Sequence, residues 1–251
     1  MFTLWISRRR LALVGIMLLL VGGYLSEQWL SEVAAVSGNP PIDRVQTERK
    51  VIALTINVDW GEDNIPGLLA ELAKAEASAT FFVTGRWAKN HPEIVTLIAD
   101  NGHQIENHGY SHPHPDRLSV EQNKEEIRKT QSIIMGITGY ETRFYAPPYG
   151  ERGSSGLRAA DELGYKTILW TLDTIDWRAD STPELIAKRV LYPETRFGLI
   201  PDHKGAIVLM HPKENTVRAL PEILAQLGKD GFEFVTINQL ITLSLSGDTT
   251  L

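Results

Sequence analysis

The fold is decided by one stretch of the chain, "KVIALTINVDWGEDNIPGLLAELAKAEASATFFVTG" (residues 50–85). Its first part, residues 50–58, is a nearly continuous apolar and β-branched run, which is typical of a strand buried on both faces. Residues 65–77 place their apolar side chains at helical spacing, and residues 79–85 read as a second strand. A strand, a helix and a strand in this order predict a parallel pair joined by a crossover helix.

The same alternation continues to residue 241. Further helices are predicted at 92–102, 119–139, 155–164, 182–191 and 216–231. Further strands are predicted at 166–173 and 205–212, at the start of 103–115 and of 143–150, which continue as turn or loop, and at 232–241, which has a helical tail. About seven such units in roughly 200 residues indicate an α/β fold in the form of a closed or nearly closed barrel. One folded domain with an appendage is therefore expected.

Composition excludes two classes of protein. The chain has 251 residues, of which 43% are hydrophobic and 22% charged, and its net charge of −6 comes without any basic stripe. A nucleic-acid partner is therefore not expected. Because the chain has no cysteine, it can have neither a disulfide framework nor a thiolate metal site.

The N-terminus has a different character from the rest. Three arginines (residues 8–10) precede an uncharged apolar run over residues 11–26, and acidic residues follow at 27 and 32. The positive-inside rule then places residues 1–10 in the cytoplasm. We expect a transmembrane anchor or uncleaved signal at 11–30, a linker at 31–48 and the folded domain at 49–245. The protein would thus be a single-pass protein of the cell membrane with an extracytoplasmic domain. A cleaved signal peptide is the alternative.

Polar side chains gather where the predicted strands end. Asp59, His108, Tyr149, Asp173 and His211 each lie at or just after the last residue of a strand. In β/α barrels this end of the sheet carries the active site. We therefore expect the five side chains to meet at one mouth.

Two of these positions suggest a metal site. His108 and His112 are spaced H-x-x-x-H, but Gly109 and Pro113 argue against a helix, so a tight turn has to bring the two imidazoles together. Two imidazoles and one carboxylate form a familiar catalytic zinc set. The alternative is a pair of surface histidines in a polar loop.

The remaining candidates would handle protons and sugar rings. Asp173 is placed to orient the His211 imidazole by a hydrogen bond, which would make that histidine a better proton donor. Tyr149 and Trp177 offer apolar faces on which a sugar ring can stack. Packing in the core is the alternative for His211 and for both aromatic residues.

Taken together, the segments resemble the polysaccharide deacetylase family with the NodB homology domain (carbohydrate esterase family 4). The resemblance covers residues 50–242 and rests on ordered motifs: "TINVDWG" (55–61) loosely, then "HGYSH" (108–112), "APPY" (146–149), "DTIDW" (173–177) and "LMH" (209–211). It implies a NodB-like, deformed (β/α)7 barrel. It also implies metal-dependent removal of acetyl groups, N-acetyl more than O-acetyl, from a cell-envelope polysaccharide such as peptidoglycan or a chitin-like glycan.

The resemblance also assigns roles to residues. It implies a divalent metal, zinc first with cobalt, nickel or manganese as alternatives, held by Asp59, His108 and His112. It implies that His211 donates a proton to the leaving group, with Asp173 in the same machinery. The acetylated glycan would be contacted by Pro147, Tyr149, Trp177 and Leu209. The other expected partner is the membrane, through the N-terminal helix, and the oligomeric state stays open.

Two positions depart from the family pattern. Asn57 stands where the family has its catalytic-base aspartate, and Ala146 stands where the family has the arginine that pairs with this base. Removing one member of such a pair leaves an uncompensated charge, whereas removing both is nearly neutral for folding. We infer that the pair was replaced as a unit.

The role of Asp59 depends on how the loop is counted. If Val58 forms a bulge, Asp59 is the metal carboxylate and Asn57 holds the base position. Counted from Gly61, Asp59 takes the base position and Trp60 falls on the metal position, which tryptophan cannot fill. The first count keeps three ligands and is preferred.

The departures leave more than one function open. The first hypothesis is a membrane-anchored glycan deacetylase, with Asn57 in the catalytic set. The alternative is a catalytically weak or inactive glycan-binding protein of the envelope or of sporulation that retains the deacetylase fold. A third is hydrolysis of an amide that is not part of a sugar.

Overall fold

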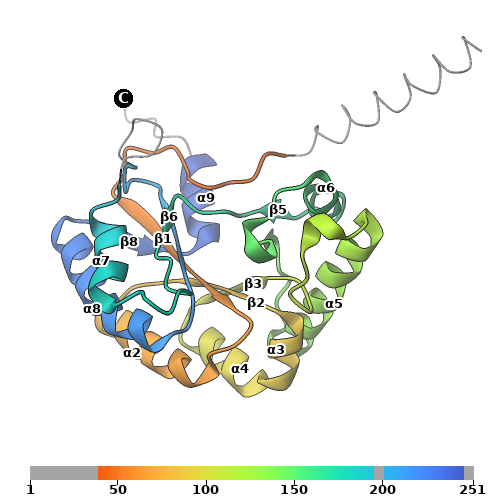
Figure 1. Ribbon diagram of the computed structural model, residues 1–251, viewed down its shortest axis with the longest axis horizontal. Coiled ribbons are helices and arrows are strands. Elements are labelled where there is room, and N and C mark those ends of the chain that lie inside the picture. Colours follow the sequence, from red (N-terminus) through yellow and green to blue (C-terminus); the bar gives the residue numbers. More distant parts are fainter. Residues whose placement is uncertain (1–38, 195–200, 246–251) are drawn as a thin grey trace, which may run out of the picture. The chain divides into compact units, whose positions relative to one another are not determined.

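The computed structural model describes residues 39–194 and 201–245, and Figure 1 shows their arrangement. The predicted N-terminal segment, the anchor and the first part of the linker, residues 31–38, lie outside these residues. Within the part of the chain that the structure describes, no helix combines the length and the apolar character that crossing a bilayer requires.

One parallel sheet organises the domain. Its strands follow the order β5-β4-β3-β2-β1-β7-β6, and β8 pairs with β1 outside this path. Their bounds are β1 (Val51–Val58), β2 (Thr80–Val83), β3 (Gln104–Asn107), β4 (Phe144–Tyr145), β5 (Lys166–Thr167), β6 (Leu172–Asp173), β7 (Ile207–Met210) and β8 (Glu233–Val235). Because the named pairings are all parallel, the carboxyl ends of the strands meet at one edge.

Helices surround this sheet, with α7 and α8 on one side and α5 and α6 on the opposite side in Figure 1. The α-helices are α2 (Ile65–Lys74), α3 (Gly85–Asn90), α4 (Pro92–Asp100), α5 (Val120–Thr138), α6 (Ser154–Glu162), α7 (Pro183–Leu191), α8 (Glu214–Lys229) and α9 (Ile237–Leu245). Three short 3-10 turns are η1 (Glu62–Asn64), η2 (Pro115–Arg117) and η3 (Pro148–Gly150). The predicted alternation of strands and helices is confirmed.

The start of α5 shows how local sequence sets an element. Ser119 accepts the backbone N–H of Gln122, and the Gln122 side chain accepts the backbone N–H of Ser119, which together form a capping box. The helix ends at Gly139, whose φ of 70° suits glycine. The predicted N-cap at Ser119 is confirmed.

The prediction of one strand over residues 166–173 was wrong. Lys166–Thr167 pairs with β4, whereas Leu172–Asp173 pairs with β7, so the stretch forms both edges of the sheet. The chain crosses between the edges at once: the N–H of Ile168 still bonds to Tyr145, and the N–H of Thr171 already bonds to Ile207. The sheet is thus curled so far that its two edges are joined by four residues, 168–171. This is a half-open form of the expected barrel.

The segment after residue 39 belongs to the domain and not to the expected linker. Ile42 forms a parallel bridge with Ile168, and Arg44 forms an antiparallel bridge with Ala206. The Val45 side chain is buried and packs in the core. This segment therefore fills the seam between the two edges of the sheet, and the domain begins near residue 39 instead of 49.

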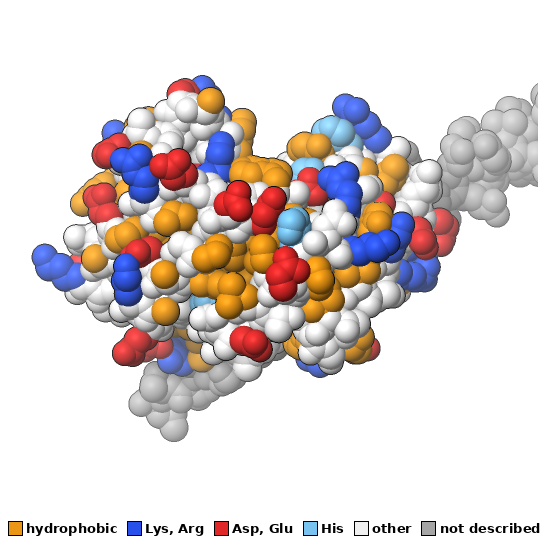
Figure 2. All heavy atoms as spheres, turned by 90° about the horizontal axis from the view of Figure 1, so that it is seen from below, with side chains coloured by type: hydrophobic (Ala, Val, Ile, Leu, Met, Phe, Trp, Pro, Cys, Tyr) orange, Lys and Arg blue, Asp and Glu red, His pale blue; other side chains and the backbone are white. Residues whose placement is uncertain are grey.

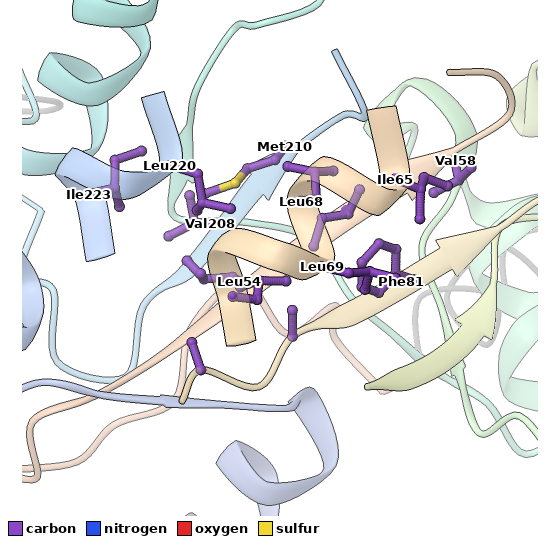
Figure 3. Close-up of a cluster of buried hydrophobic side chains, with 14 of the residues drawn as sticks. Leu54, Val58, Ile65, Leu68, Leu69, Phe81, Val208, Met210, Leu220 and Ile223 are labelled. Atoms are coloured by element: carbon purple, nitrogen blue, oxygen red, sulfur yellow. The ribbon is translucent and has the colours of Figure 1, made fainter. Parts of the chain in front are cut away.

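The side chains of β1 point alternately to two cores. Leu54 and Val58 point to the cluster between the sheet and helices α2 and α8, which Figure 3 shows together with Leu68 and Leu220. The pairing with β2 runs without interruption to Val58. The bulge that the preferred count required at Val58 is therefore absent. Counting from the strand side still leaves Asn57 at the base position, but without the bulge Asp59 no longer falls on the metal position. The alternation turns Asn57 to the opposite, inner face of the curled sheet.

Candidate active site

A cavity of about 450 Å³ lies at the carboxyl ends of the strands. Of the ten residues that the sequence singled out, nine line it: Asn57, Asp59, His108, His112, Tyr149, Asp173, Trp177, Leu209 and His211. The exception is Pro147, which is buried in the turn before Tyr149 and is not part of the lining. A larger groove of about 750 Å³ between α2 and α8 has no histidine in its lining, so it lacks the chemistry of the first cavity.

The strand ends place these side chains. Asn57 is the last but one residue of β1, His108 directly follows β3, Asp173 ends β6 and His211 directly follows β7. The prediction that the polar residues meet at one mouth is confirmed. Figure 2 shows one face of the molecule on which histidine, acidic and hydrophobic side chains, the kinds that line the cavity, lie next to one another.

A tight turn brings the two histidines together, as predicted. Gly109 has a φ of 75° and His112 a φ of 57°, both in the left-handed region. The ring centroids of His108 and His112 lie 5.0 Å apart in an edge-on arrangement. The turn is held by Glu126 of α5, whose carboxylate accepts the backbone N–H groups of Tyr110 and Ser111 at 2.9 and 2.7 Å. Sequence reasoning missed Glu126, because it lies on a helix whose docking the sequence does not reveal.

His108 is held in one orientation and in its neutral form. Its Nδ1 lies 2.7 Å from the backbone oxygen of Ala146, which leaves Nε2 for the cavity. Burial, and to a smaller extent the neighbouring His112, lower the pKa of His108 to about 3. Burial also lowers the pKa of His112. Both imidazoles are therefore ready to accept a hydrogen bond or to bind a cation at neutral pH.

The partner of His211 is Asp176. Its carboxylate accepts the His211 Nδ1–H at 2.8 Å and the His211 backbone N–H at 2.7 Å, and it also accepts the Thr216 hydroxyl at 2.7 Å. Asp176 itself is 1% exposed. The prediction that Asp173 orients this imidazole was wrong. The signal was present in the sequence, because Asp176 lies inside the quoted stretch "DTIDW".

Asp173 instead forms part of the cavity wall. One of its carboxylate oxygens accepts the backbone N–H of Ile175 at 2.8 Å, a short turn that fits the positive φ of 51° at Ile175. Burial raises the pKa of Asp173, although the Ile175 N–H acts in the opposite direction. Asp173 is therefore a partly desolvated acid beside the His211 site.

Asp59 is bound to an arginine that the sequence analysis did not single out. Its Oδ1 accepts the Thr84 hydroxyl at 2.8 Å, and Nη2 of Arg86 lies 3.1 and 3.0 Å from its two carboxylate oxygens. Thr84 and Arg86 sit at the corner between β2 and α3, next to the end of β1. The available signal was Arg86 itself, which directly follows the predicted strand 79–85.

These contacts decide whether the family's metal fits. The two neutral imidazoles suit a divalent cation, and the Nδ1 bond of His108 to a carbonyl is the usual support for a ligating histidine. The third ligand is the problem, because the carboxylate of Asp59 is neutralised by Arg86. Among the residues that the structure describes, no three histidine, aspartate or glutamate side chains form a group that could hold a metal ion. The expected set of Asp59, His108 and His112 does not fit a three-ligand centre.

The two departures from the family pattern lie where expected. Asn57 is 6% exposed and lines the cavity. Ala146 is 3% exposed and packs in the inner core, and its backbone oxygen holds His108. The base position thus carries an amide, which can donate and accept hydrogen bonds but cannot take up a proton.

Exposed aromatic rings surround the cavity. Tyr149 is 58% and Trp177 54% exposed, so packing in the core does not account for either. Trp60, at 43% exposed, is a third ring that the sequence analysis did not assign to substrate. Its ring plane lies within 7° of parallel to that of His211, with the ring centroids 6.1 Å apart. The cavity therefore has apolar platforms on several sides of the imidazole.

Comparison with known proteins finds similar sequences and structures. A family profile described as polysaccharide deacetylase matches residues 44–168. The peptidoglycan-N-acetylglucosamine deacetylase of Bacillus cereus is 31% identical over 232 residues, which is 89% of this chain and 78% of that protein. The Bacillus subtilis protein YlxY is 32% identical over 201 residues, which is 80% of this chain, and the chain spans 60% of its length.

Among solved structures, this chain is similar to a pseudoenzyme of carbohydrate esterase family 4 from Bacillus anthracis. The two are 35% identical with a TM-score of 0.74, over 80% of this chain and 69% of the other. A mutant form of this pseudoenzyme is described as having restored enzymatic activity. It is 34% identical to this chain with the same TM-score, over 80% of this chain and 71% of the other.

Proposed function

The chain belongs to the polysaccharide deacetylase family, and from this premise we propose that its cavity binds an acetylated cell-envelope glycan and hydrolyses the N-acetyl amide. The observation that carries the proposal is the pair of Asp176 and His211 at a cavity with exposed aromatic rings. A buried carboxylate that holds an imidazole at the edge of a solvent-accessible cavity is an arrangement for moving protons.

The substrate class follows from the rim. Trp60, Tyr149 and Trp177 present apolar faces around one cavity, and sugar rings carry apolar C–H faces that pack on such rings. The relatives with named activities act on peptidoglycan N-acetylglucosamine or N-acetylmuramic acid. N-acetylated peptidoglycan is therefore the proposed substrate, and a chitin-like glycan is the alternative.

His211 can serve both proton transfers of amide hydrolysis. Because a carboxylate only accepts, the Asp176 contact assigns the proton to Nδ1 and leaves Nε2 for the cavity. Nε2 would take a proton from the attacking water and return it to the nitrogen that leaves as the C–N bond breaks. Asn57 offers an amide hydrogen-bond partner for the acetyl group and does not act as the base.

A second function is favoured by specific features of the same cavity. The base position carries Asn57, Ala146 replaces the arginine that would pair with a base, and Asp59 is occupied by Arg86. The likeness to a family 4 pseudoenzyme points in the same direction. This second function is the binding of an envelope glycan with little or no hydrolysis.

The proposed location follows from the sequence alone. The arginine cluster before the apolar run at residues 11–26 supports a membrane anchor, with the cavity outside the cytoplasm where envelope glycans are found.

One experiment separates the two functions. The purified chain and its His211→Ala variant are incubated with N-acetylated chito-oligomers or peptidoglycan, with and without added Zn²⁺ or Co²⁺. Released acetate is measured, and glycan binding is measured by calorimetry. Acetate from the wild type but not from the variant supports the deacetylase. Binding without acetate supports the second function, and neither binding nor acetate overturns both.

A further inference from the structure

Both carboxylate oxygens of Asp59 are bound by neighbours from one corner of the fold. Oδ1 accepts hydrogen bonds from the Thr84 hydroxyl and from Arg86, and Oδ2 accepts one from Arg86. The Asp59 side chain is 16% exposed, whereas that of Arg86 is 52% exposed. Because little water reaches the carboxylate, Arg86 supplies much of its hydrogen bonding and charge stabilisation.

Arg86 is fixed relative to the histidine turn. Its backbone N–H bonds to the Tyr110 oxygen at 3.0 Å, and the Gly85 N–H bonds to the Gly109 oxygen at 2.9 Å. There is no room for a side chain at Gly85, because a Cβ there would lie 2.6 Å from the Thr130 hydroxyl. The backbone that carries Arg86 is thus clamped between the turn of His108 and His112 and helix α5. The Arg86 side chain therefore reaches Asp59 from a backbone position that is held in place.

Charge then decides what the site can bind. The negative charge of Asp59 is balanced by the positive charge of Arg86, and imidazoles bring no negative charge of their own. A divalent cation at His108 and His112 would meet no net negative ligand and would also be repelled by the guanidinium. Asn57, an uncharged amide, supplies no replacement. Neutral ligands beside a fixed cation make a poor site for a dication.

We propose that Arg86 excludes a tightly bound divalent metal from this cavity by holding Asp59, so that the chain differs from the metal-dependent pattern of its family at this one contact. Arg86 is a positioning residue, because it acts through Asp59. The inference does not rest on the proposed hydrolysis, because metal binding is measured directly and has the same expected result in an active or an inactive chain.

The test measures metal binding by the chelator-treated full chain, with Co²⁺ and Zn²⁺ as probes. Calorimetry gives the affinity, and the visible absorption of Co²⁺ reports its coordination. The key variant is Arg86→Gln, which removes the charge. The matched control is Arg158→Gln, which removes a similarly exposed arginine (54%) from its ion pair with Glu162 on α6. Asp59→Asn and His112→Ala are each combined with Arg86→Gln to locate the metal.

We expect Arg86→Gln to bind Co²⁺ at least about tenfold more tightly than the wild type, since it removes a nearby positive charge and frees a carboxylate. Arg158→Gln should stay within about twofold of the wild type. Adding Asp59→Asn or His112→Ala should remove the gain. Arg86→Lys, which keeps the charge, should resemble the wild type.

Two results would overturn the inference. The first is tight, one-to-one Zn²⁺ binding by the wild type that is lost in Asp59→Asn alone, because Asp59 would then be a ligand despite Arg86. The second is equal affinity of Arg86→Gln and Arg158→Gln. Circular dichroism of each variant establishes that it is folded. If Arg86→Gln does not fold, Arg86→Met is used under the same criteria, because it retains an unbranched side chain without the charge.

Discussion

The carboxylate of Asp176 is expected to be the main support of the His211 site. It accepts three hydrogen bonds of 2.7 to 2.8 Å, two from His211 and one from Thr216, and it is 1% exposed. Asp176→Ala would leave three donors without their partner. Each hydrogen bond to a charged group contributes about 1.5–3 kcal/mol, but the mutation also removes the cost of burying the carboxylate. The net loss in unfolding free energy should therefore be about 3–5 kcal/mol.

Thr216→Val provides the matched comparison. Valine has nearly the shape of threonine, so this variant removes one of the three hydrogen bonds and leaves both bonds to His211. We expect it to lower the unfolding free energy by about 1–2 kcal/mol. Urea unfolding followed by circular dichroism gives both values, provided that the dependence on urea is the same in all variants.

The functional effect should follow His211 and not stability. Asp176→Asn keeps the shape but replaces one accepting oxygen by an NH2 donor. Because the remaining oxygen is favoured at the position that accepts two donors, the NH2 group faces the His211 Nδ1–H, and acetate release should fall at least about a hundredfold. Thr216→Val should stay within about threefold of the wild type, because the imidazole keeps its partner. The reasoning fails if Asp176→Ala is as stable as the wild type, or if Thr216→Val loses as much activity as Asp176→Asn.

Three further predictions concern other parts of the chain. Burial raises the pKa of Glu106 from 4.5 to about 7. Between these two pH values the folded state holds a proton on Glu106 that the unfolded state has lost, so the unfolding free energy should fall as the pH rises from about 4.5 to above 7. The full effect is about 3 kcal/mol, and urea unfolding at pH 5 and pH 8 should show that Glu106→Gln lacks this part of the decline. Trp177→Ala should weaken binding of acetylated chito-oligomers about tenfold in calorimetry, whereas Met135→Ala, at an exposed position of α5, should not. Asn57→Asp should increase acetate release at least about tenfold if the missing base limits the rate, and an unchanged rate would show that the amide is not the limitation.

Much of the fold and of the site was predictable because parallel strands impose a simple geometry. A continuous apolar run followed by a polar residue marks a strand end, and the strand ends of a parallel sheet share one edge. This was enough to bring together side chains as far apart in sequence as Asn57 and His211. It also supported the family, which the comparisons confirm.

The failures have a common physical cause, which is that they depend on contacts between elements. Nothing in the apolar pattern of residues 166–173 marks where the chain leaves one sheet edge for the other. The partner of His211 depends on which acid of "DTIDW" turns inward, and the left-handed residue Ile175 sends Asp173 to the wall and leaves Asp176 buried under His211. Periodicity carries information about faces of one element and not about hydrogen bonds between two.

The cavity lacks the acid–arginine pair of the family pattern but contains a different acid–arginine pair. The expected acid–arginine pair at positions 57 and 146 is absent, yet Asp59 and Arg86 form an acid–arginine pair at the neighbouring strand end. A single random substitution would remove only one partner of such a pair and leave the other charge unpaired, which is costly; compensating it requires a second change. Here position 57 carries no acid, and the acid at position 59 is compensated by Arg86. The cavity therefore carries an acid–arginine pair at Asp59 and Arg86, beside the imidazole pair and the Asp176-supported histidine.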